Sequence, residues 1–427
     1  MTEAVYLPYD VLELIFRKVN GLTLGRCRRV CKYWKEFIDS SEYLWRQKCR
    51  NEFKHASRIA KRKCGHQCNW YHIYRNLCQW SDLKNFDLEL KEFYKFSHKD
   101  NLHILDIDHG LLPLRGNRGT VLYDTSTLEN ITVCVSIPDR DCLKIANNDN
   151  VTIIQVKSGV FIERTADDPD FVTEVFINGD GFALTDNYLF VYINKDIYSI
   201  DLRYRSLSPN FIMSLEYSIK EMVYSDNVLH LFIGYGYIVS LLWDPNSCCW
   251  KPSSFKPIDC PVEWIKQIKH ICAADNRNYV CYSRNLIKIQ VEKYKHLYLE
   301  FPTITALFFY VDITIFGTQT GEILLYRLSS QAPGRNRPTF ETLIRLPEGE
   351  VALHLDVCER RTGPLIVIST CYKLYVIEAP FFPDEQQTTE SSFTSEKLNM
   401  YKRMRKLKDW MKISSNNNSS QACKTKE

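Results

Sequence analysis

The residues in this sequence most capable of chemistry are cysteines and histidines near its N-terminus. Soft ligands of the kind that bind zinc are found at Cys64, Cys68, His72 and Cys78. A helix over 69–78 would place Cys68 and His72 on one face, but the overall spacing fits no standard pair of chelating knuckles. We therefore predict no metal, and we interpret the segment as the entry to a helix with a hydrogen-bonded histidine. A zinc site is the alternative.

Catalytic motifs are missing from the sequence. It contains no nucleophile elbow, no phosphate-binding loop and no paired-histidine metal motif. The acids and histidines of the long central region are better explained by loops and by the turns at strand ends. The sequence therefore predicts a protein that is not an enzyme and has no cofactor.

Arginines could bind a phosphorylated partner, because the guanidinium group pairs with phosphate through two hydrogen bonds. The candidates are Arg164, Arg203, Arg205, Arg284, Arg327, Arg360 and Arg361. They are spread over about half of the chain, and the sequence does not show whether any of them converge. The substrate-binding residues are therefore left unassigned.

Short amphipathic helices are predicted in the first fifty residues. Pro8 suits the first turn of a helix, where its missing N–H costs nothing. One apolar stripe follows, formed by Val11, Leu12, Ile15, Phe16 and Val19. A second helix is expected from Thr23, a candidate N-cap, to about Ile38, and a third is expected around Leu44 and Trp45. So small a unit cannot bury all its large side chains, so part of its apolar surface must meet a partner.

The order of these residues resembles the F-box, the helical module that docks substrate receptors onto the adaptor subunit of SCF-type ubiquitin ligases. The motifs that carry the resemblance are Leu7-Pro8, Ile15-Phe16, Val30-Cys31-x-x-Trp34 and Leu44-Trp45. It implies binding to the adaptor and, through the adaptor, to cullin and RING subunits. The residues implied to contact the adaptor, or to support that contact, are Leu7, Pro8, Val11, Leu12, Ile15, Phe16, Val30, Cys31 and Trp34. Trp34 and Phe16 could equally be internal.

A unit of two strands joined by a tight turn recurs after a further helical stretch at 69–78. Each unit closes on a similar tetrapeptide, and these end at Asp124, Glu163, Asp201, Asp244, Gln290, Arg327 and Glu378. Repeats of about 40 residues with several strands are typical of a β-propeller. Seven endings predict seven blades. The spare strand 92–97 is expected to pair into the last blade and close the ring.

The repeats resemble the WD-repeat class, most plainly at 241–244, Leu-Leu-Trp-Asp, and at 317–326. No repeat has the Gly-His pair of the standard blade, and Gln290 and Arg327 replace the terminal Asp in two units. The predicted fold is thus α plus all-β: a small three-helix F-box and a helical linker, followed by a seven-bladed β-propeller. The expected boundaries are 1–53, 54–90 and 91–383, followed by a mostly disordered tail at 384–427.

Charge is distributed unevenly along the chain. Residues 1–80 carry a net charge of +9 and residues 394–427 carry +6, which leaves −11 for the middle. A basic F-box would be steered toward an acidic adaptor, and the acidic middle argues against nucleic-acid binding. The tail segment 396–413 is basic and amphipathic, so it could bind a membrane or an acidic groove, act as a nuclear import signal, or be merely solvated.

These features together predict a substrate receptor of an SCF-type ubiquitin ligase, located in the cytoplasm, the nucleus or both. The sixteen cysteines are scattered without a signal peptide, so we expect them to be reduced. The F-box would bind the adaptor, and the propeller would bind an unknown protein substrate. Three rivals are considered: a non-ligase propeller scaffold, a ligand-binding or enzymatic propeller, and a regulator tethered to membrane by the tail.

Overall fold

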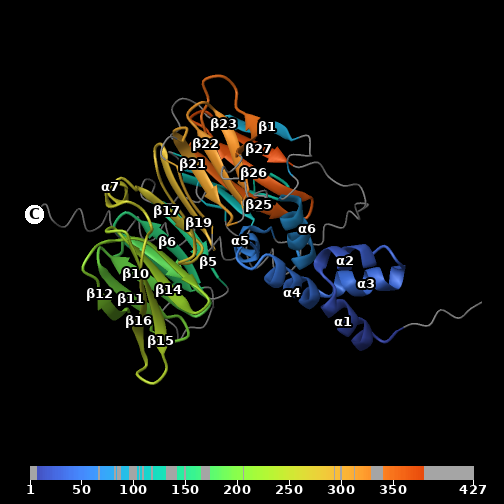
Figure 1. Cartoon of the computed structure of the whole chain (residues 1–427), viewed down its shortest axis with the longest axis horizontal. Helices are drawn as coiled ribbons and strands as arrows, with labels where there is room; N and C mark the ends of the chain where they lie inside the picture. The colour runs from blue at the N-terminus through green and yellow to red at the C-terminus, as the bar shows by residue number, and fades with distance from the viewer. Residues whose placement is uncertain are drawn as a thin grey trace, which may run out of the picture.

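Helices gather at one end of the computed structural model, and antiparallel sheets form the rest (Figure 1). The structure describes residues 7–65, 68–80, 83, 88–95, 103–104, 106–107, 110–116, 119–130, 142–148, 151–164, 174–204, 206–292, 294–298, 301–311, 313–327 and 340–378. The predicted tail, with its basic segment 396–413, lies outside these residues. Within them, no helix is both long and apolar enough to cross a membrane.

The N-terminal part contains α1 (Tyr9–Lys18), α2 (Gly21–Cys27), α3 (Lys32–Ser40) and α4 (Glu42–Glu52). Pro8 caps α1 with φ −56° and ψ 152°, and its carbonyl accepts the first helical hydrogen bond from the Leu12 N–H at 3.0 Å. Asp10 lies in the first turn of α1, while Arg17 and Lys18 lie in the last. These charges complement the helix dipole, so the start of the chain is well suited to form a helix alone.

The single helix expected from Thr23 to Ile38 is two helices, so this part has four helices rather than three. The chain is extended at Cys31, with φ −157° and ψ 164°, and the Cys31 Sγ accepts a hydrogen bond from the Trp34 N–H at 3.4 Å. The predicted N-cap is also wrong by three residues: the Asn20 side chain accepts from the Thr23 N–H at 2.8 Å. A cysteine cap is unusual, which is why the break escaped the periodicity.

The linker contains α5 (Ala56–Lys63) and α6 (Trp70–Trp80), and α6 confirms the helix expected at 69–78. Ile73, Tyr74 and Leu77 are buried in one core cluster with Trp45 of α4. The same cluster continues into the neighbouring sheets through residues such as Ile366. The helical part and the sheets therefore share a core instead of meeting at a flexible tether.

Seven antiparallel sheets are formed by the described residues (Figure 1). Along the chain, the first sheet contains β2 (His103–Ile104), β3 (Leu111–Gly116) and β4 (Gly119–Asp124), and the second contains β5 (Cys142–Asn147), β6 (Val151–Val156), β7 (Gly159–Arg164) and β8 (Glu174–Ile177). The third contains β9 (Gly181–Leu184), β10 (Tyr188–Ile193), β11 (Asp196–Asp201) and β12 (Asn210–Ser214). The fourth contains β13 (Ile219–Ser225), β14 (Val228–Ile233), β15 (Tyr237–Asp244) and β16 (Cys249–Pro257). The fifth sheet contains β17 (His270–Ala273), β18 (Asn278–Ser283), β19 (Leu286–Val291) and β20 (Tyr294–Tyr298). The sixth contains β21 (Ile304–Phe309), β22 (Ile313–Thr318), β23 (Glu322–Arg327) and β24 (Phe340–Arg345). The seventh contains β25 (His354–Arg360), β26 (Gly363–Ser369) and β27 (Lys373–Glu378), together with β1 (Glu89–Lys95). A short helix, α7 (Val262–Ile265), precedes β17.

Each predicted tetrapeptide lies at the end of the third strand of a sheet: β4, β7, β11, β15, β19, β23 and β27. The hairpin turns need positive φ, and Asn194 (φ 55°), Gly236 (φ 84°) and Gly321 (φ 77°) supply it. The first sheet has three described strands, and Asn130 adds an isolated bridge to Tyr123 of β4.

The last sheet is completed by a strand from the opposite end of the sheet region. β1 pairs antiparallel with β27, with Glu89 opposite Glu378 and Lys95 opposite Lys373. The Lys91 Nζ also lies 2.9 Å from an oxygen of Glu378. This pairing confirms the expected closing strand, which begins a few residues earlier than predicted.

From the sheet of β5–β8 onward, neighbouring sheets pack through shared apolar clusters. One cluster joins β10 to β6, another joins β14 to β10, and others continue through the later sheets until Leu114 of β3 packs with Leu374 of β27. Because successive antiparallel turns lie at opposite ends of a sheet, the ring has two faces. We call the end with the turns after the first strands, such as 225–228 and 275–278, the linker face, and the end with the turns after the second strands, such as 235–236 and 284–285, the open face.

Candidate functional site

Helix α1 divides its apolar side chains between two directions. Leu12 and Phe16 are fully buried, and the ring of Phe16 meets that of Trp34 edge-on at 5.2 Å. Val11 and Ile15, one residue before each of them, are 37% and 43% exposed. The wide stripe predicted from the sequence is therefore two adjoining surfaces, of which one forms the core and the other faces solvent.

Several other apolar residues of the N-terminal helices are also exposed. Leu7, Leu14 and Val30 are 36%, 60% and 63% exposed, and Pro8 and Cys31 also lie at the surface, while Trp34 is half-buried. The hydroxyl of Tyr33 donates to the Leu7 carbonyl at 2.9 Å and holds the start of the chain against α3. We call Leu7, Pro8, Val11, Leu14, Ile15, Val30 and Cys31 the exposed apolar surface.

The adaptor-contact residues predicted from the sequence include two that are buried in the core and omit two that are exposed at the surface. Leu12 and Phe16 can only support the exposed apolar surface, because they have almost no exposure of their own. Leu14 and Leu22, which is 59% exposed, did not fit the helical period. An apolar residue that breaks the pattern of a buried stripe was the available signal.

Exposed basic side chains lie in the same part of the chain, at Lys18 in α1, Arg26 in α2 and Arg29 in the turn after α2. Arg17 pairs with Glu13 at 2.6 Å, so its charge is compensated locally. The combination of apolar surface and positive charge suits a partner with an apolar groove and an acidic border.

Buried polar contacts fix the linker helices to the last sheet. The carboxyl of Glu359 accepts from the indole N–H of Trp80 and from the hydroxyl of Tyr310, each at 2.7 Å. The Asn76 side chain donates to the Arg360 carbonyl at 2.9 Å. Burial raises the pKa of the Glu359 carboxyl. The bonds made by Trp80 and Asn76 span 279 and 284 positions of the chain, and they set the orientation of α6.

Helix α5 binds the linker face through charged side chains. The Arg58 guanidinium donates to the Ser225 hydroxyl at 2.7 Å and also pairs with Asp226. The His55 Nδ1 lies 3.0 Å from a carboxyl oxygen of Asp275. Because these partners belong to different sheets, α5 spans the linker face and leaves the open face free of the helical part.

The cysteine and histidine group of the sequence does not come together as a zinc site. Cys64 and Cys68 are buried and hydrogen-bonded to each other, but the His72 Nδ1 accepts from the Asn69 N–H at 3.3 Å. The Cys78 thiol lies near Cys49 instead. The hydrogen-bonded histidine that we predicted is thus what the described residues show.

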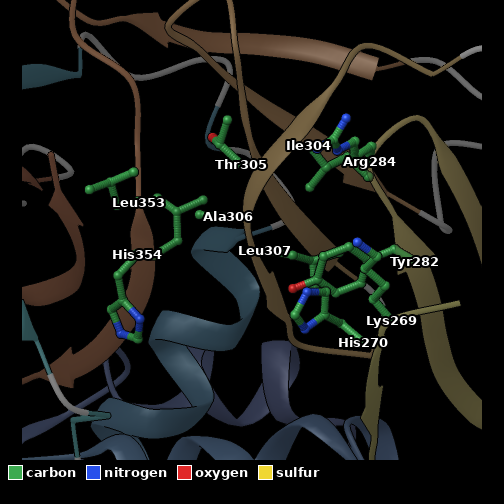
Figure 2. Close-up of a pocket in the computed structure, with 11 residues that line it drawn as sticks. Lys269, His270, Tyr282, Arg284, Ile304, Thr305, Ala306, Leu307, Leu353 and His354 are labelled. Carbon is green, nitrogen blue, oxygen red and sulfur yellow. The ribbon is translucent and has the colours of Figure 1, made fainter. Parts of the chain in front are cut away.

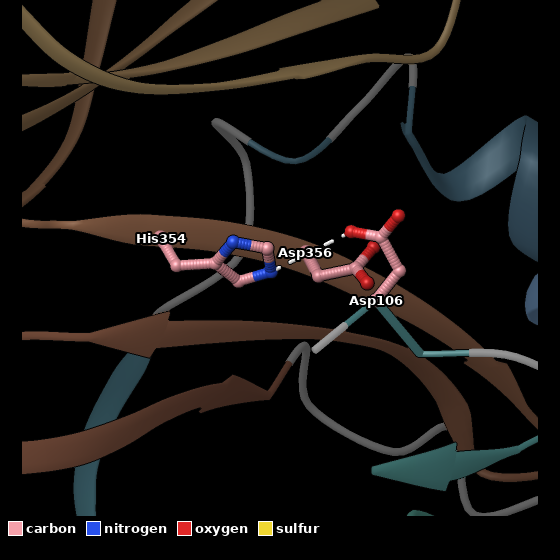
Figure 3. Close-up of side chains that lie close together, drawn as sticks. All are labelled: Asp106, His354 and Asp356. Carbon is pink, nitrogen blue, oxygen red and sulfur yellow. Dashed lines mark ion pairs between the residues drawn. The ribbon is translucent and has the colours of Figure 1, made fainter. Parts of the chain in front are cut away.

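A different trio does come together, at Asp106, His354 and Asp356 (Figure 3). Their potential ligand atoms all lie within 4.8 Å of one another. However, the Lys63 ammonium group lies 2.8 Å from Asp356 and would repel a cation. Burial raises the pKa of the Asp356 carboxyl. The trio is better described as part of an ion-pair network than as a metal centre.

The arginines singled out in the sequence do not converge. Arg164 is buried and donates to the Leu202 carbonyl at 2.8 Å, and Arg360 pairs with Glu378 at 2.7 Å. Arg203 pairs with Asp201 beside its own strand, and Arg327 lies 3.2 Å from Glu341. Arg205 lies outside the described residues. Arg284, by contrast, lies on the open face, and it lines a pocket of about 400 Å³ (Figure 2).

Comparison with known proteins supports the class of the N-terminal part. Residues 4–51 match the family model described as F-box-like. The chain therefore carries an F-box-like domain, which is followed by the seven antiparallel sheets described above.

Individual relatives are distant. A segment of 76 residues is 30% identical to mitogen-activated protein kinase kinase kinase A of Dictyostelium discoideum, which covers 18% of this chain and 8% of that protein. The WD40 β-propeller domain of Doa1 is 10% identical, with 71% of this chain and 99% of that chain covered and a TM-score of 0.43. The extracellular domain of a one-component system from B. thetaiotaomicron is 12% identical, with 67% and 39% covered and a TM-score of 0.44. Because these TM-scores are below 0.5, we describe the architecture of this chain from its own strand pairings alone.

Proposed function

We propose that this chain is the substrate-recognition subunit of an SCF-type cullin-RING ubiquitin ligase. The observation that carries the proposal is the exposed apolar surface of the F-box-like domain. Its own core is complete without Val11, Leu14, Ile15 and Val30, so these side chains are available to a partner. An F-box-like domain generally binds the SCF adaptor, and we assign the exposed apolar surface to that contact, with Leu12, Phe16 and Trp34 supporting it from inside.

The remaining parts take roles that follow from their packing. We propose that the seven sheets are seven blades of a closed ring and that the linker holds this ring in a fixed orientation to the adaptor. A substrate on the open face would then be held near the ubiquitin carrier, which raises the effective concentration of its lysines. The chain itself would be non-catalytic, would need no cofactor and would act in the cytoplasm, the nucleus or both.

The experiment that tests this function is affinity purification of the tagged full chain from cells, followed by mass spectrometry. A Val11→Asp, Ile15→Asp double variant places two carboxylates on the exposed apolar surface. An Arg46→Asp variant, at an exposed position of α4, controls for added negative charge. We expect adaptor and cullin with the wild type and the control, and their loss from the double variant while other partners remain. Absence of adaptor and cullin from the wild-type sample would refute the proposal.

The second candidate is a propeller scaffold that binds the adaptor or another helical partner without a ligase. The same purification separates the two functions. A ligase subunit should bring cullin with the adaptor, and ubiquitin-modified partners should accumulate when the proteasome is inhibited. A scaffold should bring the helical partner without cullin.

A further inference from the structure

The pocket on the open face lies between three neighbouring sheets (Figure 2). Its lining comes from the start of β17, the end of β18 and the starts of β21 and β25. Aliphatic side chains form much of its wall, at Ile304, Ala306, Leu307, Leu353 and Leu355. Its volume of about 400 Å³ is near the lower end of the range for small-ligand sites.

The charged groups that line the pocket are all basic. Lys269 and Arg284 are exposed at its rim, and none of the described residues that line it is an aspartate or a glutamate. His270 stacks on the ring of Tyr282 with 5.0 Å between centroids, and burial together with the charge of Lys269 lowers the pKa of His270. The Lys269 and Arg284 side chains give the rim a fixed positive charge, which favours an anion.

The floor of the pocket is closed toward the linker face. His354 lines the pocket, and its Nε2 lies 3.9 Å from an oxygen of Asp106 (Figure 3). Asp356, two residues further along the same strand, binds both the Lys63 ammonium group at 2.8 Å and the Ile107 N–H at 2.6 Å. Lys63 belongs to α5, so a linker helix lies behind the floor. The pocket is thus backed by the linker on one side, and a ligand would approach it from the open face.

The approach to the pocket is also shaped for a peptide. Gly236 contacts Ile265 of α7, which leads directly to Lys269. Next to Gly236, the exposed ring of Tyr235 stacks on Tyr217 with 4.6 Å between centroids. An aromatic surface therefore lies on the open face, within one short helix of the basic rim.

We propose that this pocket binds the C-terminal residue of a substrate polypeptide, with a free carboxylate and an apolar side chain. The carboxylate pairs with Lys269 and Arg284, and the side chain enters the aliphatic pocket. A chain end carries both groups on one Cα, which matches a pocket lined by both basic and aliphatic side chains, and capture of a C-terminal carboxylate is a known mode of peptide recognition. This inference rests on the proposed function only in taking the ligand to be a substrate.

The test is equilibrium binding of fluorescein-labelled decapeptide pools to the purified full chain, measured by fluorescence polarisation. One pool ends in Leu, Phe or Val with a free carboxylate, and the matched pool ends in the corresponding amide. A third pool carries an internal phosphotyrosine and an amide end. A Lys269→Gln, Arg284→Gln variant removes the rim charges. A Lys266→Gln, Arg277→Gln variant removes the same charge from exposed positions outside the pocket.

We expect the free-acid pool to bind at least tenfold more tightly than the amide pool. The rim variant should lose that advantage while the control variant keeps it. Equal binding of the two pools, preference for the phosphotyrosine pool, or no binding of the free-acid pool at 1 mM (about −4 kcal/mol) would each overturn the inference. Because the assay needs no adaptor, its failure leaves the proposed function standing, and a failed adaptor purification leaves the pocket inference standing.

Discussion

Removal of the Lys63 ammonium group should weaken the junction between the linker and the propeller. Lys63 and Asp356 are both almost fully buried, and their charged atoms are 2.8 Å apart. At that distance the attraction is about 6 kcal/mol for an effective dielectric constant near 20, before the cost of desolvation. Breaking a buried pair by removing one partner typically costs about 3–5 kcal/mol, because the other charge stays buried.

A Lys63→Met variant should fall at the lower end of that range, at about 3 kcal/mol. Asp356 keeps two backbone donors, the N–H of Ile107 at 2.6 Å and that of Val357 at 2.8 Å, and these still stabilise its charge. The assay is urea unfolding of the full chain followed by tryptophan fluorescence, in which Trp80 reports on the junction. A Lys63→Met, Asp356→Asn double variant should recover part of the loss, because it leaves no buried charge.

The same variant should depend on pH in a defined direction. Burial already raises the pKa of the Asp356 carboxyl, and removal of the neighbouring ammonium group raises it further. A carboxyl whose pKa is higher in the folded state contributes stability at low pH and loses it as pH rises through the folded pKa. The deficit of Lys63→Met relative to wild type should therefore be larger at pH 8 than at pH 5. A deficit below about 1 kcal/mol, or one independent of pH, would refute this reasoning.

Three further predictions follow from other contacts. Phe16→Ala should lower the free energy of unfolding by about 3–5 kcal/mol because it opens a cavity in the F-box core. Val11→Asp should change it by less than about 0.5 kcal/mol because Val11 is exposed. Thermal unfolding measures both effects, and equal losses would contradict the division of α1 into two faces. Burial raises the pKa of Glu359, so the stability that this carboxyl contributes should fall as the pH rises above its pKa in the unfolded chain. Glu359→Gln should therefore make the free energy of unfolding depend less on pH, as measured by urea titrations between pH 5 and 8. Gly236→Ala should lower the free energy of unfolding more than Gly349→Ala in the same assay. Both glycines have positive φ, where an alanine costs about 1–2 kcal/mol of strain. Only at Gly236 would the new Cβ also lie 2.5 Å from Ile265, because the space around Gly349 is open.

Local patterns in the sequence were enough to predict the repeating part of the fold. The seven tetrapeptide endings mark the third strands because alternation and turn residues act over short distances. The break at Cys31 was missed because it depends on a thiol cap, and Leu14 was missed because it fits no buried stripe.

Contacts between distant residues could not be predicted in this way. Trp80 and Glu359, or Lys63 and Asp356, are brought together only when the linker packs on the last sheet. The pocket likewise takes Arg284, Ile304 and Leu353 from three different sheets, and no spacing in the sequence connects them. The exposed apolar surface could be predicted in part from the sequence because it is local, whereas the open-face pocket could not because it is assembled from distant strands.

The pairing of β1 with β27 has a consequence for synthesis. Glu89 pairs with Glu378, which is translated almost 300 residues later. At a translation rate of about 5–20 residues per second, this delay is roughly 15–60 s. During that time the helices of the F-box are already complete, while the strand that follows the linker has an unpaired edge. The ribosome therefore exposes the F-box-like domain before the ring of sheets can close, and binding of a partner to this domain would not require a finished ring. The unpaired β1 is also the segment of the nascent chain most open to pairing with a wrong strand.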